Sequence, residues 1–226
     1  MYLLKFQLTD FERDFIFNKA YRSKQEIINL LLYATKIILN KKPVAYNTEK
    51  SSYLFLIIDK MSRIVFFKKN KSFSITFPFQ YFEKENDEGK YPTILMKGLD
   101  YEINNIVILS LETILQKINL EDSDLWDILS FLEEIPLSNY EIDQKNYNSF
   151  ISKLFFRLIL SEDGYLRYDY DELGFKPDKP HLHPLHHLDI FYSSNPTFKI
   201  GLKASLSYSD FIKIIDIKTD CKYLVN

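Results

Sequence analysis

The chain has very little cysteine and glycine, and each shortage excludes a class of protein. Among its 226 residues there is one cysteine, Cys221, so neither a disulfide framework nor a cysteine-based zinc site can form. There are five glycines, and the sequence contains no glycine-rich phosphate loop, G-x-S-x-G elbow or kinase motif. We therefore expect a reducing compartment and disfavour nucleotide-dependent transfer chemistry.

An excess of charge of one sign and a long hydrophobic run are also missing. The 29 basic and 31 acidic residues give a formal net charge of −2, which excludes a polybasic nucleic-acid coat protein but permits a local basic patch. No apolar window approaches the roughly 18–20 residues of a membrane span. The first residues lack the pattern of a signal peptide. These absences predict a soluble, cytoplasmic protein with no membrane contact.

The patterns that are present indicate one α+β domain over residues 1–226, with antiparallel sheet packed against several helices. Ser23 and Glu26 have capping-box spacing and predict a helix that ends near Lys41. Further helices are predicted at 101–118, 122–134, 148–160 and 210–217. Strands are predicted at 53–59, 63–69, 72–79, 165–171, 187–193 and 198–202. We also expect an exposed loop at 83–90 and an inward-facing Trp126.

All four histidines lie within seven residues, as His181, His183, His186 and His187. Histidine has the unperturbed pKa closest to neutrality and is the commonest metal ligand. If this protein performs chemistry, the segment around these side chains is therefore the first candidate for the site.

Alternation along the three carboxy-terminal strands predicts a shared polar face, because successive side chains of a strand point to opposite sides. If the apolar sides pack on the core, the other side gathers Arg167, Asp169, Asp171, His187, Asp189 and Lys199. His181, His183 and His186 would enter from the adjoining loop. A one-residue change of register would scatter this group.

Three interpretations of this polar face are open. In the first, metal-free acid–base chemistry cleaves a phosphodiester, with His187, His183, Arg167, Asp169, Asp189 and Lys199 as the candidate catalytic residues. In the second, His181, His183 and an aspartate hold a metal. In the third, the charged pairs only stabilise the sheet.

Two other features favour plain structural roles. Lys68, Lys69 and Lys71 lie at a predicted hairpin tip, where solvated lysines are commoner than phosphate contacts. The phenylalanines of 73–82 could stack on bases, but phenylalanine at alternate positions usually belongs to a core.

The carboxy-terminal segments RYDYD (167–171), HPxxHLD (183–189), KIG (199–201) and SxSDFIKII (207–215) resemble a bacterial family catalogued as domain of unknown function 2290. The chain departs from that pattern at Asp189, where a histidine is usual, and at Lys199, where an arginine is usual. The resemblance implies a small cytoplasmic bacterial protein without an assigned activity. By analogy with toxin families of similar Arg-Tyr-Asp…His layout, it favours a defence or toxin–antitoxin role.

These observations lead to three hypotheses about function. The first is a cytoplasmic bacterial effector of a toxin–antitoxin or anti-phage system, acting as a nuclease on nucleic acid. The second is a non-enzymatic subunit of a larger defence complex, with a protein partner encoded nearby. The third is a metal-dependent hydrolase. The sequence identifies no cofactor.

Overall fold

The structure, a computed structural model, describes residues 2–44, 52–60, 62–87, 89–134, 143–179, 182–192, 197–216 and 218–219. His181 and Cys221 lie outside the described residues. None of the helices in these ranges combines the length and the apolar composition needed to cross a membrane.

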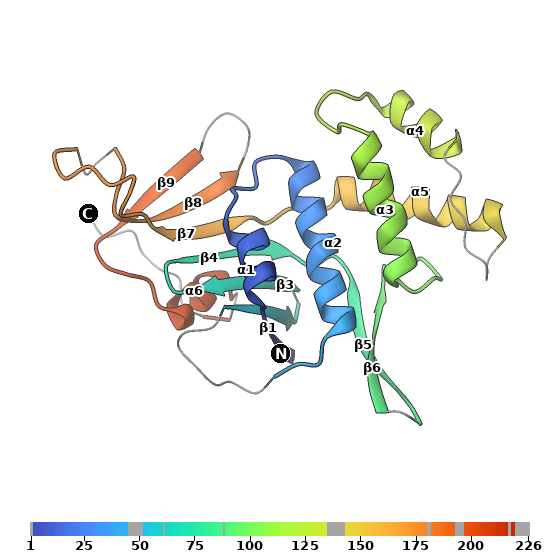
Figure 1. Ribbon diagram of the computed structural model, residues 1–226, viewed down its shortest axis with the longest axis horizontal. Helices are drawn as coiled ribbons and strands as arrows, with labels where there is room; N and C mark the ends of the chain where they lie inside the picture. Colours follow the sequence, from blue (N-terminus) through green and yellow to red (C-terminus); the bar gives the residue numbers. More distant parts are fainter. Residues whose placement is uncertain are drawn as a thin grey trace.

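A seven-stranded antiparallel sheet with strand order β1-β2-β3-β4-β7-β8-β9 forms the centre of the fold (Figure 1). Its strands are β1 (Tyr2–Gln7), β2 (Tyr53–Ile58), β3 (Arg63–Lys68), β4 (Lys71–Thr76), β7 (Leu166–Tyr170), β8 (His186–Tyr192) and β9 (Thr197–Leu202). A separate two-stranded sheet pairs β5 (Gln80–Asn86) with β6 (Gly89–Leu95). Together with the helices, these sheets confirm the predicted α+β class.

The helices are distributed unequally over the two faces of the large sheet. They are α1 (Asp10–Phe17), α2 (Lys24–Asn40), α3 (Asn105–Lys117), α4 (Leu125–Glu134), α5 (Gln144–Leu160) and α6 (Tyr208–Ile215). The larger apolar cluster packs the first five helices with one face of β1–β4. A smaller cluster, centred on Phe211 of α6, covers the other face. Among the described residues of β7, β8 and β9, none belongs to the larger cluster, so on these strands the first face is free to carry polar groups.

Capping explains where the first two helices begin. Ser23 accepts the Glu26 amide while the Glu26 side chain reaches back to the cap, as the capping-box spacing predicted. Thr9 and Glu12 form the same motif at the start of α1. Neither α1 nor β1 was identified from the sequence, because both elements are short and their apolar and polar residues form no clear periodic pattern.

Two sequence-based expectations are wrong. Residues 83–86 and 89–90 lie in the strands of the β5–β6 hairpin rather than in a loop. Glu83–Asn86 is exposed, as expected, but on both faces, so no period-two burial signal marks the strand. Trp126 is 75% exposed. Helix α4 instead buries Ile128 and Leu132, one turn apart on its other side.

Phe73 on β4 belongs to the larger apolar cluster and is fully buried. Its ring lies 4.8 Å from the ring of Phe66 and 5.4 Å from that of Phe17, centroid to centroid. We expect Phe73→Ala to lower the free energy of unfolding by about 3–5 kcal/mol, because it removes a large side chain and leaves a cavity. Urea denaturation measures this. Phe82→Ala, at a ring that is 47% exposed, should change stability far less, and similar losses in the two variants would contradict the assignment.

Candidate functional site

Strand register brings the candidate residues together in two rows that cross β4, β7, β8 and β9. One row reads Phe73, Arg167, Asp189 and Lys199, and the next reads Lys71, Asp169, His187 and Gly201. Directly opposed residues of antiparallel strands share a face. The rows therefore lie on the face predicted from alternation, beside the point where the apolar cluster ends. We call Arg167, Asp169, His187, Asp189 and Lys199 the polar cluster.

Arg167 holds the two carboxylates of the polar cluster. Its Nε atom lies 2.6 Å from Asp169 Oδ2, and its terminal nitrogen donates to Asp189 Oδ2. Burial by itself lowers the pKa of Arg167, but interactions with Tyr165, Asp169 and Asp189 outweigh it and raise that pKa. The guanidinium is thus permanently charged and fixes the carboxylates from below the surface.

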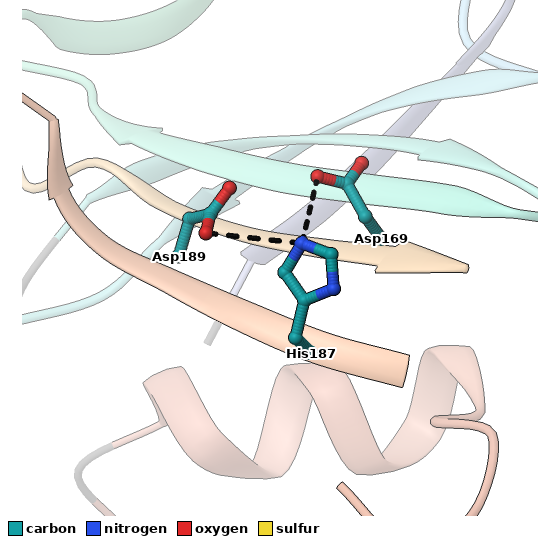
Figure 2. A group of neighbouring side chains, drawn as sticks. All are labelled: Asp169, His187 and Asp189. Carbon is teal, nitrogen blue, oxygen red and sulfur yellow. Dashed lines mark ion pairs between the residues drawn. The ribbon is translucent and has the colours of Figure 1, made fainter. Parts of the chain in front are cut away.

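His187 directs Nε2, the ring nitrogen that does not bond to the backbone, toward both carboxylates (Figure 2). Nδ1 lies 2.9 Å from the Pro184 carbonyl oxygen, which can only accept, so Nδ1 carries the proton. Nε2 lies 3.8 Å from Asp169 Oδ2 and 3.8 Å from Asp189 Oδ1. Because burial lowers the pKa of His187, the ring is neutral near pH 7 and Nε2 keeps its lone pair.

A buried oxygen of Asp189 completes the arrangement. Oδ1 accepts no hydrogen bond from the described residues, although the side chain is 1% exposed. The Lys199 ammonium lies 3.5 Å from Oδ1 and 3.1 Å from His187 Nε2. Asp169, His187 and Asp189 each offer one ligand atom, all within 4.8 Å of one another. Two carboxylates and one imidazole form a donor set that suits divalent transition-metal ions.

The other histidines have different surroundings. His183 Nε2 lies 2.7 Å from Asp171 Oδ2, and its ring meets the His187 ring edge-on at 5.1 Å. Burial raises the pKa of Asp171, but the Gly174 amide and His183 outweigh it, and the pKa is lowered. His186 lies on the opposite face of the sheet, with Nδ1 2.9 Å from the Tyr168 hydroxyl. The structure thus places His183 beside the polar cluster and His186 away from it.

Sequence reasoning gave no role to Gly201 and Pro184, which position His187. A Cβ atom on Gly201 would lie 2.9 Å from Pro184 Cγ, closer than carbon atoms approach without displacement. The absence of a side chain therefore lets Pro184 pack on β9, where its carbonyl reaches the imidazole. Both residues lie in the HPxxHLD and KIG segments, but nothing in a single sequence pairs the two.

A pocket of about 440 Å³ opens beside the polar cluster, and we call it the lysine pocket. It is lined by Asn18, Lys19, Ala20, Lys68, Asn70, Lys71, Arg167, Asp169, Tyr170 and Asp171. Lys71 is half-buried and donates to the carbonyl oxygens of Phe17 at 3.1 Å and Lys19 at 3.3 Å. At this lysine the hairpin tip is therefore packed against the end of α1 rather than fully solvated.

Acidification should destabilise the protein through His187. Its folded-state pKa is lowered, so the unfolded chain binds the proton first as the pH falls through about 6.5. The free energy of unfolding should therefore decrease between about pH 7 and pH 5. The lowered pKa of Asp171 affects the free energy of unfolding only at pH values near or below the ordinary pKa of a carboxyl group. Urea denaturation at both pH values should show a weaker decrease in His187→Gln, and an unchanged decrease would contradict this origin.

Comparison with models of known protein families gives no match to the chain. Neither the curated proteins nor the solved structures give a match. The resemblance to the family catalogued as domain of unknown function 2290 therefore remains a prediction.

Proposed function

We propose that this protein is a cytoplasmic bacterial effector that hydrolyses phosphodiester bonds in nucleic acid, with a divalent cation held by Asp169, His187 and Asp189. One observation carries the proposal. A neutral imidazole with a fixed tautomer places Nε2 3.8 Å from an oxygen of each of two carboxylates, and the lysine pocket opens next to them.

The burial of His187 favours a ligand over a general base. A general base must come within hydrogen-bond reach of the proton it removes, but the His187 side chain is 1% exposed. A metal ligand needs no such access. Metal-binding histidines usually donate their second ring N–H to a carbonyl or carboxylate, as His187 does to Pro184. Each carboxylate oxygen lies 3.8 Å from Nε2, so either one could share an ion with the imidazole at about 2.2 Å from both atoms.

The surroundings of the cluster fit a phosphodiester. A divalent cation in this position would polarise a phosphoryl oxygen and activate a water. Asp169 is the ligand that also lines the lysine pocket, so the substrate would approach from there. Lys19, Lys68 and Lys71 offer positive charge to backbone phosphates. Arg167 is buried and paired with both carboxylates, and its role is to position them.

The second candidate function, a non-enzymatic interaction subunit, is favoured by the exposed aromatic side chains. Trp126 is 75% exposed and Phe11 is also 75% exposed. Aromatic residues are common anchors of protein interfaces. In this function the polar cluster only stabilises the sheet, and the purified protein has no turnover with any cation.

Cleavage assays with labelled RNA and DNA distinguish these functions. With Mn²⁺, Mg²⁺ or Zn²⁺ supplied in turn, we expect hydrolysis by the wild type that chelation abolishes. Asp189→Asn should reduce the rate by about 100-fold or more, because it removes a ligand charge at the cation. Asp178→Asn, at an exposed position of the loop after β7, is the matched control. Full activity in chelator would contradict the metal, and full activity of Asp189→Asn would contradict the site.

Lys199 should compete with the cation. Its ammonium lies 3.1 Å from His187 Nε2, and its side chain is 28% exposed and able to move away. We expect Lys199→Met to bind Mn²⁺ about tenfold more tightly, equivalent to about 1.4 kcal/mol. Calorimetric titration measures the affinity. Lys203→Met, at an exposed lysine just after β9, should match the wild type. An unchanged or weaker affinity in Lys199→Met would place the ion elsewhere.

A further inference from the structure

A second pocket, of about 700 Å³, lies on the opposite face of the sheet from the polar cluster. It is lined by Phe67, Lys69, Asn70, Tyr168, Tyr170, His186, Ser205, Leu206, Ser207, Tyr208 and Ser209, and we call it the aromatic pocket. Its volume lies in the range of small-molecule sites, which are mostly apolar with a few placed polar groups. No residue of the polar cluster lines the aromatic pocket.

Aromatic rings in fixed orientations line this pocket. The His186 ring stacks on the Tyr170 ring at 4.9 Å and 21°, and it lies nearly parallel to the Tyr168 ring at 6.2 Å and 6°. Tyr208 meets the Phe67 ring edge-on at 5.2 Å. Because His186 and Tyr170 already stack on each other and Tyr168 is buried, another planar ring would have to stack on an outer face of this group of rings. The pocket is therefore suited to a planar ligand.

Lys69 gives the lining of the pocket one positive charge that a phosphate could meet. No carboxylate is present among the described residues that line it. Two negatively charged side chains bond to hydroxyl groups of the lining: Glu172 accepts from the Tyr170 hydroxyl, and Asp210 accepts from Ser207 Oγ at 2.6 Å. A planar ring next to phosphate is the chemistry of a nucleotide.

The aromatic pocket and the lysine pocket meet at the end of the sheet. Both are lined by Asn70 and Tyr170. The turn between β3 and β4 contributes Lys69 to one pocket, and the strand ends that flank it contribute Lys68 and Lys71 to the other. A nucleic-acid strand that crosses this turn would keep its phosphates near lysine along the whole path.

We propose that the aromatic pocket holds an unpaired base of single-stranded nucleic acid whose backbone crosses the β3–β4 turn to reach the polar cluster. The inference rests on the proposed function and adds its substrate class. A base inside a duplex is paired and stacked on both sides, so it cannot enter such a pocket without being extruded. Stacking on aromatic side chains accepts any base, so the preference is for single strands rather than for a sequence.

Binding measured in chelator tests this without cleavage. Fluorescence anisotropy compares the full chain on a labelled single strand of roughly 12 nucleotides, on its duplex and on an abasic strand of equal charge. The wild type should bind the single strand on the order of tenfold more tightly than the other two. In Tyr170→Ala that advantage should disappear. Tyr170→Phe should keep it, as should Tyr91→Ala, which removes an exposed tyrosine of β6.

His186→Leu provides a second variant, since it removes a stacked ring that lines the aromatic pocket alone. It too should lose the preference for bases over the abasic strand. If the wild type binds the abasic strand or the duplex as tightly as the single strand, or if both variants keep the preference, the inference is overturned. Absence of cleavage with the preference intact would instead overturn the proposed hydrolysis and leave the base pocket standing.

Discussion

The arrangement of the carboxy-terminal half depends on one buried interaction, the pairing of Arg167 with Asp169 and Asp189. Two carboxylates beside an imidazole would repel each other if they were left alone in a region with little water. The guanidinium of Arg167 joins the two carboxylates and keeps them beside the imidazole, with Asp169 at the wall of the lysine pocket. Removing one partner of such a buried ion pair leaves an uncompensated charge and lowers the free energy of unfolding by roughly 3–5 kcal/mol.

Strand β7 connects the two proposed sites because its side chains alternate. Arg167 and Asp169 point to the polar cluster, while Tyr168 and Tyr170 line the aromatic pocket on the other face. A shift of β7 by one residue would exchange the two sets. Strand β7 is an interior strand that pairs with β4 on one edge and β8 on the other, and this double pairing fixes its register. Catalysis and base recognition would thus share one rigid element.

The unequal helix cover explains why the polar cluster can exist on the same face as the main core. Helices α1 and α2 pack on the part of the sheet that ends at Phe73 and Tyr165. Beyond these residues the side chains on the same face are charged rather than apolar. Lys71 lies at this boundary and donates to the backbone carbonyl oxygens of Phe17 and Lys19, at and just after the end of α1. The site therefore lies at the edge of the core. Its charged groups are buried on one side, and on the other side Arg167 and Asp169 line the lysine pocket.

Much of this protein is determined by local sequence. Capping at Ser23 and the apolar alternation of the strands predicted the elements and the shared face of Arg167, Asp169, His187, Asp189 and Lys199, because alternation needs only neighbours along the chain. Short or fully exposed elements, such as β1 and the β5–β6 hairpin, carry too weak a burial pattern to be recognised this way.

Only the tertiary structure decided what the histidines do. The sequence groups four of them, but the fold turns His187 toward the carboxylates, pairs His183 with Asp171 and sends His186 to the opposite face. The contact of Gly201 with Pro184 and the packing of Lys71 on α1 join residues far apart in the chain. Such contacts depend on which strands pair and on what covers each face, and a local pattern contains neither.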